Sequence, residues 1–378
     1  MNSVWTIEGP GELPEEFFAI GSAARMNDPT YIPEVPEELR ERFRSRHWWF
    51  ESGGLCRVFL AGASARLAAF VHPQARTGNA HAGFFGWWAS AGDTSADDLV
   101  FEAAQEFLSQ HNCQSMIGPV DQSSLFGYRL LDQRSDSLGP FPDEPDTPVR
   151  MAEYLMDRGF RRLHSYNTRL VRSNELAAIN DAIEPVVQRS RDSGFEVEPL
   201  TPEAVEDRVD EIANTIQAVF ADNIGFVAPP DGVIQHWLVD HAAPRMCPDL
   251  SMAVYTSDRS LAGWMLVYPH YGPLVWQQRS AGRVTTDTLT YARHFGELTE
   301  MLLPHRPWAV CKTVAFAPQF QDQGLVTMMV YEANKRCVDT YDGWMLALSR
   351  MDNHTQGFYQ PDAEGRRLYS VYEHRFST

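Results

Sequence analysis

The sequence lacks the features that mark secreted, membrane-spanning and disulfide-stapled proteins. No stretch approaches 18 uninterrupted apolar residues, so we expect no membrane-spanning helix and no membrane partner. Residues 1–16 have no basic start and no apolar core, so we expect no secretory signal. The five cysteines are scattered, odd in number and contain no Cys-x-x-Cys pair. This pattern favours a reduced, cytoplasmic protein and supports no metal site.

The sequence is also poor in positive charge. It has 32 lysines and arginines against 50 aspartates and glutamates, a net charge of −18. Binding to a nucleic-acid backbone needs clustered positive charge, so we expect no nucleic-acid partner. An acidic surface suggests a cationic or amine substrate, although surface charge is a weak guide to specificity.

The length of 378 residues predicts two domains. We place their boundary near residue 190, where a polar stretch is followed by Gly194. Residues 1–190 predict the order β, α, β, β, β, α, β, α, β, and residues 191–378 predict β, α, α, β, β, β, α, β, α, β. The chain therefore reads as a tandem repeat of one fold.

The most informative stretch covers residues 308–338. Residues 308–316 are apolar and rich in β-formers, and Pro318 ends this predicted strand. A polar turn leads to Gly324, after which apolar residues recur at helical spacing. The first amides of such a helix bind phosphate without a lysine. Because glycine has no Cβ, we expect Gly324 to let a phosphate approach the backbone.

This stretch resembles a motif of the GNAT acyltransferases, in which a strand is followed by Arg or Gln, two residues, Gly, one residue, and Gly or Ala. The order of predicted elements resembles the same family, as does Gly159-Phe160 after a helix in the first half. The resemblance implies an α/β (α+β) fold, a tandem GNAT fold of two mixed, mostly antiparallel sheets flanked by helices. The matching residues here are Gln321, Asp322, Gln323, Gly324, Leu325 and Val326, the last replacing the small residue.

The resemblance also implies a cofactor, acetyl-CoA or another acyl-CoA, bound by the second half. The backbone of residues 314–316 (Val314, Ala315 and Phe316) would hold the pantetheine arm. Gln321 and the amides from Asp322 to Thr327 would hold the pyrophosphate. Asn353 would touch the cofactor, and Tyr359 would be the general acid on the leaving thiolate. The spacing from Asn353 to Tyr359 is one residue shorter than the family's.

The first half is interpreted as a degenerate copy, structural or substrate-shaping. Its corresponding turn, SAGDTSADD, has no suitably placed Arg or Gln and contains three aspartates, which would satisfy a helix N-terminus internally. This half also resembles a group of bacterial GNAT-like proteins in residues 83–86 (GFFG) and 118–121 (GPVD). The loop of residues 121–128 either makes only turns and core or lines a cleft facing the second half.

The sequence assigns no general base. His270 and Tyr271 follow a strand and could reach the cleft, but they are also ordinary loop residues at a strand end. Alternation from Phe316 predicts Cys311 on the opposite face of its strand, so we interpret it as a core residue. His236 and His241, five residues apart on a helix, are predicted not to share a face.

Three functions stay open at this point. The first is direct transfer of an acyl group, such as acetyl, from acyl-CoA to an amine of a small molecule in a ternary complex. The second is a non-catalytic or repurposed tandem GNAT that binds a ligand or protein partner. The third, transfer from aminoacyl-tRNA, is disfavoured by the net charge. The acceptor and the oligomeric state cannot be read from the sequence.

Overall fold

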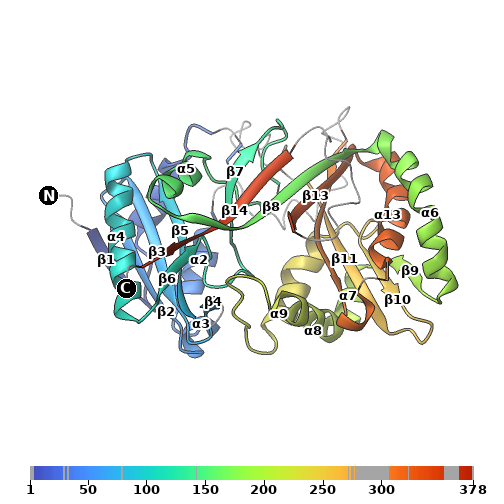
Figure 1. Cartoon of the computed structure of the whole chain (residues 1–378), viewed down its shortest axis with the longest axis horizontal. Coiled ribbons are helices and arrows are strands. Elements are labelled where there is room, and N and C mark those ends of the chain that lie inside the picture. The colour runs from blue at the N-terminus through green and yellow to red at the C-terminus, as the bar shows by residue number, and fades with distance from the viewer. Residues whose placement is uncertain are drawn as a thin grey trace.

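The computed structural model describes residues 4–28, 30–31, 34–77, 80–141, 143–270, 272–273, 276, 306–321, 323–352 and 366–376. Its strands form one long sheet that runs through both halves of the chain (Figure 1). The order is β1-β2-β3-β5-β6-β14-β8-β13-β12-β11-β10-β9, with β4 beside β5 and β7 beside β14. The strands are β1 (Val4–Gly9), β2 (Leu55–Ala61), β3 (Ala65–Val71), β4 (Arg76–Thr77), β5 (Ala80–Ser90), β6 (Ser115–Gly118), β7 (Leu130–Arg134), β8 (Arg161–Arg172), β9 (Glu196–Pro199), β10 (Met252–Tyr255), β11 (Leu261–Pro269), β12 (Trp308–Phe316), β13 (Gly343–Arg350) and β14 (Arg366–Arg375).

The predicted class, mixed and mostly antiparallel sheet flanked by helices, is confirmed. Among the described pairs, β5 with β6 and β12 with β13 are parallel, and the others are antiparallel. The two predicted sheets are joined into one at the centre of the molecule.

The join is an exchange of strands between the halves. Strand β8 belongs to the first half of the sequence, yet it pairs with β13 of the second. Strand β14 ends the second half, yet it pairs with β6 of the first. The two exchanged strands also pair with each other, and they cross in the middle of Figure 1. The boundary near residue 190 thus divides the sequence, while the sheet is shared across it.

Helices cover both faces of each half. In the first half, α4 and α5 pack on one face, and α1 to α3 pack on the other. In the second half, α6 and α13 cover one face, and α7 to α9 cover the other (Figure 1). The helices are α1 (Glu15–Ala23), α2 (Pro36–Phe43), α3 (Trp48–Glu51), α4 (Thr94–Gln110), α5 (Arg150–Asp157), α6 (Leu176–Asp192), α7 (Pro202–Asp207), α8 (Val209–Phe220), α9 (Val233–Trp237) and α13 (Leu325–Thr340), and 3-10 or π turns are η1 (Ser173–Glu175), η2 (Leu238–Ala242), η3 (Ala243–Arg245) and η4 (Pro318–Phe320).

Sequence patterning missed helices α2, α3 and α6 and strands β4 and β7. Helix α6 contains Pro185 and crosses the predicted boundary. Helix α6 matters most for the site, because it packs along α13. In the part of the chain that the structure describes, no helix is both long and apolar enough to cross a membrane.

Candidate functional site

Strands β12 and β13 pair over their first residues and then separate. Their parallel register begins with Trp308 opposite Gly343 and ends with Cys311 opposite Leu346. Beyond this point β12 stays paired with β11 alone, while β13 pairs with β8. Within the described residues no strand pairs with the other edge of residues 312–316, which we name the open edge. An unpaired strand edge presents a row of backbone donors and acceptors that a ligand can use.

A β-bulge in β12 marks the start of the open edge. Leu266 and Val267 are consecutive on β11 but pair with residues two apart on β12, so Lys312 is the extra residue. The bulge shifts the alternation by one residue. Cys311 therefore packs against the same core as Phe316, and the prediction that they lie on opposite faces was wrong. Burial raises the pKa of the Cys311 thiol to about 12, as expected for a core residue rather than a nucleophile.

A second irregularity bends β13 away from β12. Its register with β8 shifts between Leu346 and Ser349, so two residues face one on the neighbouring strand. Leu348 has a φ of 59°, which is rare for a branched side chain. Its N–H donates to Thr168 Oγ1 at 3.2 Å instead of continuing the ladder. The separation of the strands is thus built into both of them by bulges.

The turn after β12 leads into α13 as the sequence predicts. Helix α13 starts at Leu325, with Gly324 as its N-cap at a φ of 71°, and no described side chain caps it. A Cβ on Gly324 would lie 3.1 Å from Val186 Cγ1 of α6. The space that a Cβ on Gly324 would take is therefore filled by α6, and the approach of a phosphate to this backbone stays a prediction. Glycine is needed here for its φ and for close helix packing.

The other residues predicted from the motif differ in exposure. Gln321 and Gln323 are exposed, Val326 is half-buried, and Leu325 lies in the core. Thr327 is buried, and within the described residues its hydroxyl has no hydrogen-bond partner. A buried hydroxyl without a partner is costly, which makes Thr327 a candidate to meet a ligand.

On β12, the three predicted contact residues divide between the faces of the sheet. Val314 and Phe316 are half-buried beside the core under α13, and Ala315 is buried against the helices on the other face. All three belong to the open edge, where their backbone groups rather than their side chains are the predicted contacts.

Several predicted residues lie outside the described residues. These are Asp322, Asn353, Tyr359 and Tyr271. The role of Tyr359 as general acid, and those of Asn353 and Asp322 at the cofactor, therefore stay predictions.

His270 does not have a free ring nitrogen. Its Nε2 donates to the carbonyl of Leu138 at 3.0 Å, because a carbonyl can only accept, and its Nδ1 accepts from Gly272 N–H at 3.4 Å. Burial lowers the pKa of this imidazole to about 4. His270 thus anchors a loop as a neutral side chain and is not placed to act as a base.

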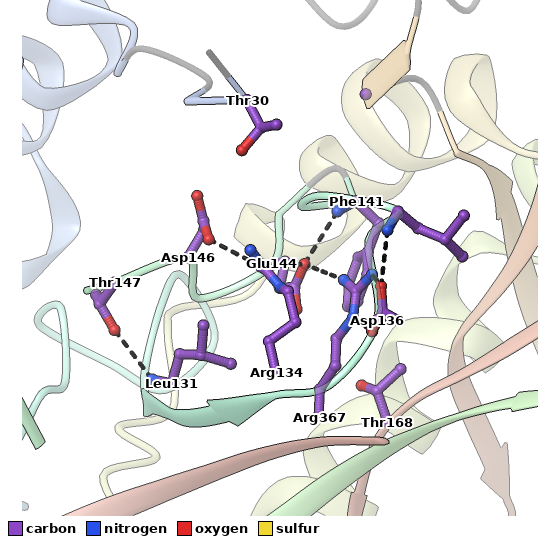
Figure 2. A network of polar contacts seen from close by, with 12 residues as sticks. Thr30, Leu131, Arg134, Asp136, Phe141, Glu144, Asp146, Thr147, Thr168 and Arg367 are labelled. Carbon is purple, nitrogen blue, oxygen red and sulfur yellow. Dashed lines mark hydrogen bonds and ion pairs between the residues drawn. The ribbon is translucent and has the colours of Figure 1, made fainter. Parts of the chain in front are cut away.

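The loop that His270 anchors comes from the first half and covers the second. We name residues 136–141 and 143–148 the acidic loop. Figure 2 shows Arg367 of β14 between two of its carboxylates: Nε and Nη2 bond Asp136 at 2.8 and 2.7 Å, and Nη1 bonds Glu144 at 2.6 Å. Arg134 joins Glu144 to Asp146, at 3.3 and 2.8 Å. Arg367 and Glu144 are fully buried, so the loop is fixed by paired charges.

The acidic loop forms one wall beside the open edge. Phe141 is buried against Leu170, Val310 and Met345, on the face of the sheet opposite α13. Lys312, at the bulge, donates from Nζ to the carbonyl of Asp143 at 2.8 Å. No signal in the sequence predicted this arrangement, because Lys312 and Asp143 are 169 residues apart and match no motif.

The loop of residues 121–128 touches the second half, as one of its two interpretations required. Ser123 Oγ donates to the carbonyl of Val227 and accepts from its N–H, both at 3.1 Å. Ser124 N–H donates to the carbonyl of Gly225 at 2.9 Å. This loop is therefore an interface between the halves.

The same part of the chain fills the first half's equivalent of the open edge. Strands β5 and β6 also pair only as far as Phe84 opposite Ile117. Val120 N–H then donates to the carbonyl of Phe85 at 2.7 Å, and Trp87 N–H donates to Asp121 Oδ1 at 2.9 Å. The first half thus occupies this edge with its own chain.

The helix that follows in the first half is also satisfied internally. Asp93 caps α4 and accepts from the N–H groups of Ser95 and Ala96 at 3.1 and 3.3 Å. This agrees with the expectation that an aspartate of this turn satisfies the helix N-terminus internally. A carboxylate at these amides leaves no vacancy for a phosphate.

His236 and His241 do contact each other, which corrects the prediction that they share no face. Their ring centroids are 6.4 Å apart. The reason is the π-helical turn η2, in which residues five apart come together. Among the described residues no group of three or more His, Cys, Asp or Glu side chains is arranged to hold a metal.

Comparisons with solved structures agree with this architecture. A tandem GNAT protein from the clavulanic acid biosynthesis pathway matches with a TM-score of 0.51 and 10% identity, covering 100% of this chain and 99% of that one. The chain has a tandem GNAT fold. A GCN5-related glucosamine N-acetyltransferase region of a fungal multi-domain β-N-acetylglucosaminidase matches with a TM-score of 0.53 and 11% identity. It covers 99% of this chain, which spans 38% of that protein.

At such identities the likeness to these two structures establishes the fold alone. By sequence, no protein-family model and no curated protein matches the chain. Function must therefore be argued from the site itself.

Proposed function

We propose that the second half of this tandem GNAT protein binds an acyl-CoA and transfers its acyl group to an amine of a small molecule. The observation that carries the proposal is the open edge of β12, followed directly by a helix N-terminus without a side-chain cap. An extended ligand with amide groups and a terminal phosphate matches both features. The filled edge in the first half explains why one acyl-CoA is expected per chain.

The residues present fit such a ligand. The backbone of Val314, Ala315 and Phe316 offers unpaired groups to a pantetheine arm, and the first amides of α13 suit a pyrophosphate. The hydroxyl of Thr327 supports the same assignment, because it is buried near those amides and lacks a partner among the described residues. Gly324 supports it only through the backbone shape of the turn.

The main task of the protein in this reaction is to position the acyl donor and the amine. When bound, the thioester supplies an activated acyl carbon and a thiolate leaving group. The chain would hold the donor along β12, hold the amine beside it under the acidic loop, and exclude water from between them. The amine must lose one proton before it attacks, and the leaving thiolate must gain one. Tyr359 is our proposed donor of that second proton.

A binding role without catalysis is the second candidate. It is favoured by the state of the nearby acids and bases, since Asp136 and Glu144 are paired with Arg367, and both nitrogens of His270 are engaged. The described residues therefore show no ready base beside the open edge.

Isothermal titration of the full chain with acetyl-CoA and with coenzyme A tests the proposal. We expect one site per chain with micromolar affinity. Release of free thiol from acetyl-CoA in the presence of a panel of amines then separates the two candidates: turnover supports the transferase, and binding without turnover supports the second candidate. No binding at millimolar acetyl-CoA would refute the acyl-CoA site altogether.

A further inference from the structure

Two cations lie on one face of the sheet beside the open edge. Lys312 is the bulged residue of β12, and its ammonium lies 5.5 Å from the ring centroid of Phe141. The guanidinium of Arg129 lies between two tyrosine rings, 3.6 Å from that of Tyr128 and 4.0 Å from that of Tyr166. The charge of Arg129 also acts on Lys312, since it helps to lower the pKa of the lysine.

Both cations lie on the face of the sheet that the acidic loop covers. Tyr166 and Leu170 are four residues apart on β8, so their side chains share a face, and Leu170 packs with Phe141. Helix α13 covers the opposite face. Lys312 is also four residues before the end of β12, roughly 13 Å along the strand from the turn that leads to α13. The phosphates proposed at α13 are therefore not the partners of these cations.

The charge of Arg129 lacks a carboxylate partner among the described residues. Its charge is supported by the hydroxyls of Tyr166 and Tyr369, and its Nε is buried without a hydrogen-bond partner. Burial lowers the pKa of this guanidinium to about 10. Arg129 also has a φ of 86°, a backbone conformation that costs energy in a residue with a side chain. A buried cation held in this way is unfavourable until an anion joins it.

The carboxylates near Lys312 are also engaged by other residues or half exposed. The carboxylates that act on it are those of Asp143 and Glu144. The Asp143 side chain is half exposed and is 3.9 Å from Arg245, and Glu144 is held by Arg367 and Arg134. Burial is the main cause that lowers the pKa of Lys312 to about 8. Lysine occurs in this sequence only at positions 312 and 335, so Lys312 is one of just two lysines in the chain.

We propose that Arg129 and Lys312 bind a carboxylate on the acceptor, so that the acceptor is an amine that also carries an acidic group. Both residues have donors left over: Lys312 uses one of its three on Asp143, and Arg129 Nε is unpaired among the described residues. The inference rests on the proposed function for the identity of the acceptor, but the anion site itself can be tested alone. It narrows the expectation, drawn from the net charge, of a cationic or amine substrate.

The first experiment examines the anion site without any acyl transfer. Full-length protein labelled at lysine with ¹³C and ¹⁵N gives two lysine spin systems, with Lys335 on the exposed face of α13 as internal reference. Titration with malonate at constant ionic strength should raise the pKa of Lys312, because an anion favours the charged form. The Lys335 signals should not move. Equal movement of both lysines, or none, would overturn the site.

The second experiment measures acceptor preference. Thiol release from acetyl-CoA is compared for amino acids and their carboxamides, in which a neutral amide replaces the carboxylate. We expect kcat/KM to favour the carboxylates by roughly tenfold or more in the wild type, and this preference to be lost in Arg129→Gln and Lys312→Gln. Lys335→Gln should keep it, and Lys312→Arg should keep part of it because the positive charge remains.

The outcomes separate this inference from the proposed function. Acetyl-CoA binding with equal use of carboxylates and carboxamides overturns the inference and leaves the acyl-CoA site standing. If acetyl-CoA does not bind, the proposed function fails, and the malonate titration still decides whether Arg129 and Lys312 form an anion site. Calorimetry with acetyl-CoA on each variant shows whether folding and donor binding survive the substitution.

Discussion

The backbone N–H of Trp87 donates to the carboxylate of Asp121 at 2.9 Å, so the first half closes with its own side chain the strand edge that the second half leaves open. A Cβ on Gly86 would lie 2.4 Å from the same carboxylate oxygen, so the strand approaches Asp121 very closely. Burial raises the pKa of the Asp121 carboxyl to about 6. The closed edge of the first half therefore contains a titratable group, the Asp121 carboxyl.

Asp121→Asn should remove a pH dependence of stability. Because the folded pKa of Asp121, about 6, lies above its usual value of 3.8, its contribution to stability is fully present below pH 3.8 and is lost as pH rises through 6. The wild type should therefore lose about 1–3 kcal/mol relative to the variant between pH 3.8 and pH 6. Asparagine keeps an oxygen that can accept from Trp87. Urea unfolding at a series of pH values measures the difference, with exposed Asp207→Asn as a charge-matched control. Parallel curves for wild type and Asp121→Asn would contradict the prediction.

Arg367→Met should be strongly destabilising. It leaves the carboxylates of Asp136 and Glu144 buried without their main partner, and breaking a buried pair in this way costs about 3–5 kcal/mol. Arg46→Gln removes an exposed ion pair with Glu41 and should have no measurable effect. Both are compared by denaturant unfolding. A loss as small for Arg367→Met as for Arg46→Gln would mean that the acidic loop is not held by this pair.

Gly324→Ala should destabilise the protein even without ligand. A φ of 71° costs an alanine about 1–2 kcal/mol, and its Cβ would also press on Val186. In a Val186→Ala background, the loss of stability that comes from the steric contact should disappear, and the loss that comes from the backbone conformation should remain. Thermal unfolding of the single and double variants separates the two. If Gly324→Ala is neutral in both backgrounds, the turn must be able to adopt another shape.

Thr327→Val should weaken acetyl-CoA binding without harming the fold. The hydroxyl has no partner within the described residues, so valine of similar shape should leave stability unchanged or raise it. If the hydroxyl meets a phosphate, the dissociation constant should rise by about tenfold. Calorimetry and thermal unfolding are run on the same samples, with Thr215→Val on α8 as a control. Unchanged affinity would remove Thr327 from the proposed site.

Local sequence signals correctly predicted where some of the strands and helices lie. Strand β12 was predicted with the bounds that the structure has, because it is an apolar run rich in β-formers closed by a turn signal. Gly324 correctly marked the start of α13, the helix of which it is the N-cap. These features depend on neighbours within a few residues, which is why a sequence can specify them.

Other features depended on contacts between residues far apart in the sequence, which local patterns do not predict. Alternation tells a strand which face to bury but not which strand to pair with, so the exchange of β8 and β14 could not be foreseen. The bulge at Lys312 changed the face of Cys311 because register is set by the neighbouring strand. Arg129 and Lys312 come together only because the halves share one sheet. Local signals in the sequence thus determined β12, the turn at Gly324 and the start of α13, whereas the open edge, its closure in the first half and the cations beside it were decided by tertiary pairing.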